Sequence, residues 1–151
     1  MNLGNLFVLA ALGSTLACGG GTASRTASSP PPVTFADQVT LGGTLYGEEC
    51  ASCHGKGGEG GKAPRVVGLA QGALPLDPPA GSTMRKTRFT TVSDVADFVV
   101  EKMPPGKGRS LTTEQYLAIL AFDLHANGID LETKLDPNVA KTLTIPRVAE
   151  H

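Results

Sequence analysis

Two cysteines and a histidine stand within five consecutive residues, Cys50-Ala51-Ser52-Cys53-His54. Thiols at this spacing can each add to one of the two vinyl groups on the same porphyrin edge, and the thioethers then hold the ring against the backbone. The residue that follows, His54, is thereby placed under the iron as its proximal ligand. This C-x-x-C-H pattern is the attachment signature of haem c, so we expect one covalently bound haem.

Other chemistries fit this motif less well. A structural zinc site needs four ligands, and outside the motif the chain has only one further cysteine, Cys18. A thioredoxin-like redox pair belongs in a βαβ context, which the sequence lacks. Residues 55–60 match G-x-G-x-x-G, but no strand pattern precedes them. We therefore interpret these glycines as a tight loop that leaves His54.

The second axial position of a haem iron decides what the haem can do, and three internal residues are candidates for it: Met103, Met84 and His125. Met103 is favoured because it follows a predicted helix and precedes Pro104-Pro105, and proline restricts the backbone of a ligand loop. Met84 has no such stiffening neighbour. His125 falls in the last turn of a predicted helix, where a histidine commonly faces the helix dipole.

Three helices are predicted to position these residues, over about 36–50, 92–102 and 113–126. The last is the clearest, since Leu117, Leu120, Ala121 and Leu124 form a stripe with helical spacing. Capping signals support the boundaries: Thr91 with Asp94, Thr112 with Gln115, and Asn127-Gly128 as a stop. Residues 55–81 are predicted to form a long loop, and residues 129–151 an irregular tail. The apolar residues of the tail predict either that it covers its own domain or that it docks on a partner.

The first residues of the chain are typical of an export segment. Residues 1–17 are mostly apolar, too short to span a bilayer comfortably, and suited to a signal peptide. The segment Leu16-Ala17-Cys18, followed by three glycines, resembles a bacterial lipobox, which implies lipidation of Cys18. Residues 18–34 have the Gly/Ser/Pro-rich composition of a tether. We therefore expect an exported domain over 35–128, held at the periplasmic face of a bacterial membrane by an N-terminal lipid.

Composition excludes some functions. The 151 residues carry a formal net charge of −1, which argues against a nucleic-acid partner. Aromatic residues make up 5% of the chain, Trp is absent, and there are 19 Gly and 11 Pro. A cofactor could supply the core volume that such a sequence lacks. Six basic residues, Arg85, Lys86, Arg88, Lys102, Lys107 and Arg109, are predicted either to steer an acidic partner or to form an ordinary solvated surface.

Over about residues 36–128 the sequence resembles the class I cytochrome c family. Gly42 and Tyr46 stand four residues apart on the first predicted helix, with the aromatic four before the first haem cysteine, as in that family. Ile119 and Phe122 match the apolar and aromatic pair of its last helix. The stretches Met103-Pro104, Leu111-Thr112 and Ala121-Phe122 also look like its distal segment and last helix. The resemblance implies an all-α fold wrapped around one haem.

The resemblance also implies roles around the haem. The family has a proline after the motif whose carbonyl accepts a hydrogen bond from the proximal histidine, and Pro64 is the candidate. Arg65, Arg85 and Arg88 are candidates for contacting the haem propionates.

These features predict a one-electron carrier that exchanges electrons with a redox-protein donor and acceptor and is not itself an enzyme. Ligation by histidine and methionine closes both axial positions and raises the potential relative to two histidines. A haem c subunit of a periplasmic dehydrogenase or oxidase complex is the alternative. A haem-based sensor would need a labile distal ligand, and a peroxidase would need a distal acid–base histidine, for which there is no obvious candidate.

Overall fold

The structure of the chain is a computed structural model, and it describes residues 31–73, 76–78 and 80–147. The predicted signal segment, Cys18, most of the tether and the terminal His151 lie outside these residues. Within the described part no helix is long and apolar enough to cross a membrane.

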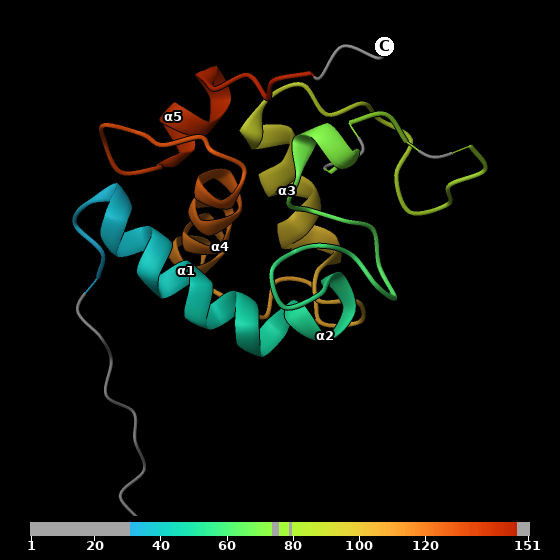
Figure 1. The fold of residues 1–151 in the computed structure, drawn as a ribbon, viewed down its shortest axis with the longest axis horizontal. Helices are drawn as coiled ribbons and strands as arrows, with labels where there is room; N and C mark the ends of the chain where they lie inside the picture. The colour runs from blue at the N-terminus through green and yellow to red at the C-terminus, as the bar shows by residue number, and fades with distance from the viewer. Residues whose placement is uncertain (1–30, 74–75, 79, 148–151) are drawn as a thin grey trace, which may run out of the picture. The chain divides into compact units, whose positions relative to one another are not determined.

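The described residues form helices and no β-strand (Figure 1). In chain order the elements are α1 (Phe35–Glu49), α2 (Ala51–His54), the 3-10 helix η1 (Leu69–Gln71), α3 (Val92–Lys102), α4 (Thr113–Ala126) and α5 (Pro137–Thr142). An isolated antiparallel bridge joins Thr91 to Thr144. The predicted all-α class is confirmed.

Local capping explains where the long helices begin. Thr91 and Thr112 accept hydrogen bonds from the third backbone N–H of α3 and α4, and the side chains of Asp94 and Gln115 reciprocate. The bounds of these two helices match those predicted. Thr34 and Asp37 form the same device at α1, so this helix begins one residue earlier than predicted.

Two short helices were not predicted. The haem motif itself is helical, as α2, and the segment 129–151, predicted to be irregular, contains α5. Asp136 caps α5 by accepting from the backbone N–H groups of Asn138 and Val139, and Pro137 occupies its first turn. Helices of four and six residues are too short to show a 3.6-residue period, so the pattern could not reveal them.

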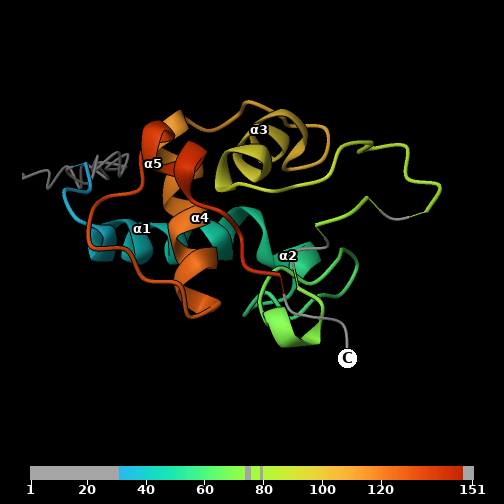
Figure 2. The same cartoon turned by 90° about the horizontal axis from the view of Figure 1, so that it is seen from above.

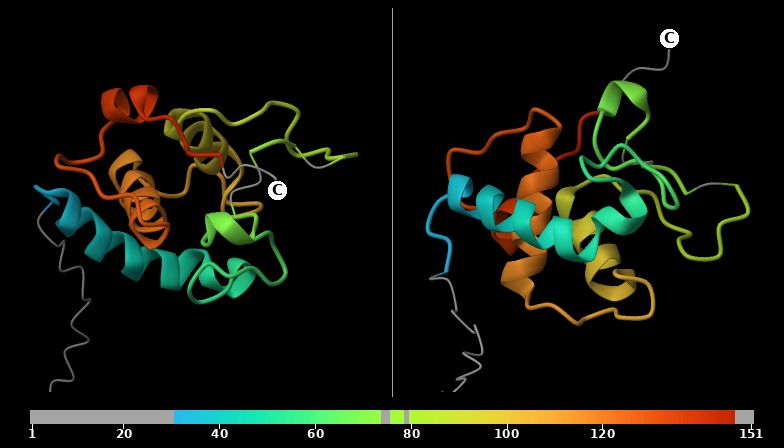
Figure 3. Two further views of the ribbon diagram at one scale, coloured as in Figure 1. Left: turned by 45° about the horizontal axis from the view of Figure 1, so that its top comes forward. Right: turned by 60° about the horizontal axis from the view of Figure 1, so that its bottom comes forward.

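Helices α1 and α4 cross at close range (Figure 3). A Cβ added at Gly42 would lie 1.9 Å from the backbone oxygen of Ala118, so only glycine allows this approach. The rings of Tyr46 and Phe122 stack beside the crossing, with centroids 5.0 Å apart. Ile119 belongs to the same buried cluster. The two pairs of residues taken from the family resemblance therefore meet in the structure.

The C-terminal segment packs on its own domain. Leu135, Ala140 and Ile145 are buried in one cluster with residues of α1, α3 and α4, and α5 packs on α3 (Figure 2). Gln38 of α1 fixes the segment, since its amide donates to the carbonyl of Leu135 and accepts from the N–H of Leu135, at 2.8 and 2.7 Å. The prediction that the tail covers its own domain is therefore confirmed for these apolar residues.

Candidate haem site

The haem motif follows the end of α1 without a linker. Cys50 is the last capping residue of α1, with its N–H bonded to the carbonyl of Tyr46 at 2.9 Å, and α2 starts at the next residue. The N–H groups of Cys53 and His54 both donate to the carbonyl of Cys50. This single turn brings the two half-buried thiols and the imidazole into one local unit. Both cysteines are free thiols in the structure.

The imidazole of His54 is oriented by a backbone carbonyl. Its Nδ1 lies 2.7 Å from the oxygen of Pro64, which is the contact that the family resemblance implied. A carbonyl only accepts, so Nδ1 carries the proton and donates, and Nε2 keeps a free electron pair. Such a bond fixes the tautomer and ring orientation of a metal ligand and raises its basicity. This geometry suits His54 as an axial ligand of a haem iron.

The loop that carries Pro64 is held at both ends. At its start, the N–H of Ala63 donates to the carbonyl of Cys53, and the Tyr46 hydroxyl donates to the carbonyl of Gly55, at 3.0 Å each. At its end, Asn127 of the α4 C-cap donates to the carbonyl of Val66 and accepts from the N–H of Gly68. The loop is therefore part of the folded framework that orients His54.

Helices α2 and α3 do not contact each other. No Cα atom of α2 lies within 8 Å of a Cα atom of α3, whereas α2 packs on α1, and α3 packs on α4 and α5 (Figure 1). The free thiols and the oriented imidazole on α2 fit a covalently attached haem. Cys50 and Cys53 would carry it, and His54 would ligate its iron.

Met103 lies where α3 ends. It is the half-buried C-cap residue of that helix, and its N–H donates to the carbonyl of Val99 at 2.9 Å. Its own carbonyl accepts from the Tyr116 hydroxyl of α4 at 2.9 Å. Two helices thus fix the backbone of Met103, which a distal ligand requires.

The other two distal candidates are placed differently. Met84 is 52% exposed, on the loop before α3. His125 is exposed as well, and its Nδ1 pairs with Asp130 at 2.6 Å. Neither has the backbone support that Met103 receives.

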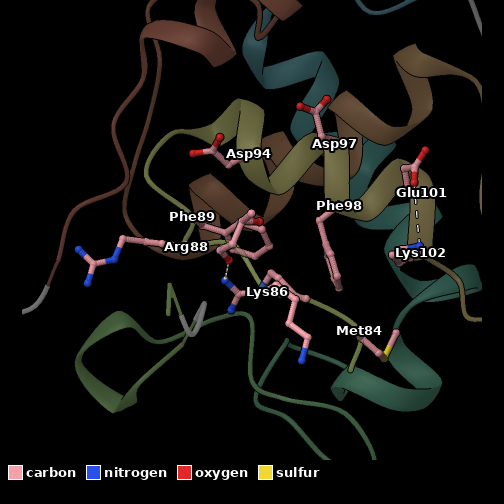
Figure 4. Close-up of a pocket in the computed structure, with 11 residues that line it drawn as sticks. Met84, Lys86, Arg88, Phe89, Asp94, Asp97, Phe98, Glu101 and Lys102 are labelled. Atoms are coloured by element: carbon pink, nitrogen blue, oxygen red, sulfur yellow. Dashed lines mark hydrogen bonds and ion pairs between the residues drawn. The ribbon is translucent and has the colours of Figure 1, made fainter. Parts of the chain in front are cut away.

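A cavity of about 340 Å³ lies between the Met84 loop and α3, and it is not lined by the haem motif or Met103. Figure 4 shows Phe98 extending from α3 toward the loop that carries Met84. Both acidic and basic side chains line the cavity, among them Lys86, Arg88, Asp94, Asp97, Glu101 and Lys102. Its mixed charge singles out no ligand.

The arginines considered for the haem propionates have other contacts. Arg85 is 8% exposed; its guanidinium stacks 3.8 Å from the centre of the Phe89 ring and donates to the backbone carbonyls of Leu76, Asp77 and Thr87. Arg88 pairs with Asp77 at 2.6 Å. Arg65 donates to the carbonyl of Val67. Arg85 thus holds its own loop together rather than adding to a surface charge.

Sequence reasoning missed a buried acid, Asp123 of α4. Its side chain is 9% exposed, and its Oδ1 has no hydrogen-bond partner among the described residues. Burial raises the pKa of Asp123 to about 8. Burial first, and then the charge of Asp123, raise the pKa of the Cys50 thiol to about 12. Cys50 packs against the buried cluster that contains Ile119, one helical turn before Asp123 on α4. The signal available in the sequence was one acidic residue inside the otherwise apolar run from Leu117 to Leu124.

The helical fold and this site define a c-type cytochrome. Residues 37–122 match the family model described as cytochrome c oxidase, cbb3-type, subunit III, and the chain belongs to that family. A solved structure titled the sulfane dehydrogenase SoxCD from Paracoccus pantotrophus is similar, with 26% identity and a TM-score of 0.51 over 89% of this chain and 68% of that chain. No curated protein sequence matches significantly. The family implies covalently bound haem c and electron transfer through it.

Proposed function

We propose that this chain is an exported one-electron carrier with a single haem c, ligated by His54 and Met103, and that it has no enzymatic activity of its own. The observation that carries the proposal is the 2.7 Å contact between His54 Nδ1 and the Pro64 carbonyl beside two free thiols. A haem iron supplies reversible one-electron redox chemistry. Electron exchange with a redox-protein donor and acceptor needs only brief protein–protein contacts of small area.

Each residue of the site has a separate role around the haem. Cys50 and Cys53 hold the group covalently, so it is not lost between encounters with partners. The Pro64 carbonyl keeps His54 in the ligating tautomer. Met103, held by α3 and by the Tyr116 hydroxyl, would be the second protein ligand of the bound iron, which would leave no site for a substrate. A closed site favours electron transfer over ligand binding or catalysis.

The test of the ligand set is Met103→Ala in protein matured with haem c. We expect the variant to keep its covalent haem and to bind added cyanide or imidazole, which the wild type resists. The wild type should show the weak far-red charge-transfer band of methionine sulfur on Fe(III), and the variant should lose it. Met84→Ala is the matched control, because that side chain is 52% exposed. Loss of the band in Met84→Ala alone would overturn the assignment of Met103.

A membrane tether through a lipid on Cys18 completes the proposal. A tether of Gly, Ser and Pro keeps such a domain near its partners and raises their effective concentration. Cys18→Ser should move the protein from the membrane fraction to the soluble periplasmic fraction. Retention of the variant on membranes would contradict a lipid at this residue.

A permanent haem c subunit of a redox complex is the second candidate. It is supported by the family, described from an oxidase subunit, and by the similarity to a solved sulfane dehydrogenase. Gel filtration of protein gently solubilised from its source membrane separates the two: a carrier elutes alone, whereas a subunit elutes with a dehydrogenase or oxidase.

A further inference from the structure

Asp123 lies in an apolar part of the core. A small cavity of about 20 Å³ beside it is lined by Val92 and Val95 of α3, Leu120 and Leu124 of α4, and Ile145 of the C-terminal segment. No lining side chain other than that of Asp123 is polar. A carboxylate in such surroundings has lost its hydration without gaining a hydrogen bond at Oδ1, and this favours its protonated form.

The titratable groups that face Asp123 are few. From α1 and its C-cap they are the Tyr46 hydroxyl and the Cys50 thiol, and burial first, then the charge of Asp123, raise the pKa of both. Among the described residues of α3 and the C-terminal segment, up to residue 147, only apolar side chains line the cavity. Burial keeps the Tyr46 hydroxyl neutral while Asp123 ionises, and Cys50 carries no thiol proton once it is bonded to the haem. Among these groups Asp123 therefore titrates alone.

Cys50 makes this acid relevant to the cofactor. Cys50 is one of the two residues to which the haem is attached. The charge of an ionised Asp123 carboxylate that acts on Cys50 therefore also acts on the edge of the bound ring. An ionised carboxylate there stabilises the more positive, oxidised iron, while the protonated acid does not. By linkage, oxidation of the iron makes Asp123 a stronger acid, and reduction makes it a weaker one.

We propose that Asp123 is a proton-binding group coupled to the redox state of the haem, so that the chain takes up a proton together with an electron over part of the pH range. The inference rests on the proposed function only through the bound haem. In that range one electron from the redox donor reduces Fe(III) to Fe(II), and one proton from solvent converts the Asp123 carboxylate to the acid. On reoxidation both leave. At lower pH the acid stays protonated, and at higher pH it stays ionised.

The experiment is a spectroelectrochemical titration of the haem-loaded full chain at a series of pH values from 5 to 10. We expect the midpoint potential of the wild type to fall with rising pH in one step. A tenfold difference in proton affinity between the two redox states corresponds to about 59 mV. In Asp123→Asn, which cannot ionise, we expect the step to vanish and the potential to stay near the low-pH value of the wild type.

Controls separate Asp123 from other groups. Haem propionates also titrate, but a step due to them would survive in Asp123→Asn and would overturn the proposal. Glu132→Gln removes the same charge from an exposed position and should keep the wild-type step. Asp123→Leu, matched to the apolar surroundings, gives a second folded variant should Asn not be tolerated. A potential independent of pH in a haem-loaded wild type would overturn this inference alone, whereas a chain that binds no haem would also overturn the proposed function.

Discussion

The Nδ1 atom of His54 and the carbonyl oxygen of Pro64 lie 2.7 Å apart, ten residues apart in sequence. The contact joins the helical haem motif to a loop without regular structure. Because the acceptor is a backbone atom, the bond depends on the path of that loop and not on a side chain.

This dependence predicts the effect of Pro64→Gly. Glycine keeps the carbonyl but releases the restriction that proline places on the backbone, so the acceptor should point at His54 for less of the time. A weaker bond makes the imidazole a less basic ligand and stabilises oxidised iron less, so the midpoint potential should rise. Potentiometry of the matured protein measures this. The same substitution at Pro137, in the first turn of α5, should leave the potential unchanged. Equal potentials in wild type and Pro64→Gly would argue against the role of this bond.

Gly42→Ala tests the crossing of α1 and α4. Its Cβ would lie 1.9 Å from the Ala118 backbone oxygen, and backbone cannot rotate away as a side chain can. We expect a loss of about 3 kcal/mol or more in the free energy of unfolding, measured by denaturant titration. Gly47→Ala is the matched control on the same helix, since nothing lies within 4 Å of its added Cβ. There the better helix propensity of alanine should stabilise the protein by up to about 1 kcal/mol. Similar destabilisation in both variants would contradict a specific contact at Gly42.

Gln38→Ala tests the attachment of the C-terminal segment. The substitution leaves the buried N–H and carbonyl of Leu135 without their partner. Each unsatisfied group costs about 1–3 kcal/mol, so for the two groups we expect a total loss of about 2–6 kcal/mol. Hydrogen exchange at the Leu135 amide should also be faster in Gln38→Ala than in the wild type. Thr40→Ala, at an exposed position of α1, should leave that amide protected.

The buried acid also predicts how stability depends on pH. The pKa of Asp123 is about 8 in the folded chain and near its ordinary value of about 4 when unfolded. Between these values the folded state binds more protons than the unfolded state, so this group makes stability fall as the pH rises from about 4 to about 8. One proton sets a limit of about 1.4 kcal/mol per pH unit. Thermal unfolding of the wild type should show this decline, and Asp123→Asn should flatten it.

Below that window other carboxyls act in the opposite direction. Hydrogen bonds lower the pKa of the capping-box residues Asp37 and Asp94, so their stabilisation is lost as the pH falls through their folded pKa values. An unchanged slope between pH 4 and 8 in Asp123→Asn would show that some other group produces the decline.

Much of the fold was predictable because its signals are local. The capping pairs Thr91 with Asp94 and Thr112 with Gln115 lie within single turns, and the bounds of α3 and α4 followed from them. The motif from Cys50 to His54 is equally local, since its chemistry depends on the spacing of five residues. Family resemblance added longer-range expectations, of which the contact between His54 and Pro64 and the crossing at Gly42 are present in the structure.

Other features exist only in three dimensions. Gln38 and Leu135 are 97 residues apart, and no local pattern relates them. The sequence placed Arg85 among charges available to a haem or a partner, but the fold stacks it on Phe89 and surrounds it with carbonyls. Asp123 looks like an ordinary helical carboxylate until α1, α3 and the C-terminal segment close around it. The sequence alone determined the attachment chemistry and the three long helices, because spacing and caps act within a turn. Tertiary structure decided burial, and with it which charged groups are fixed, which are exposed and which titrate near neutral pH.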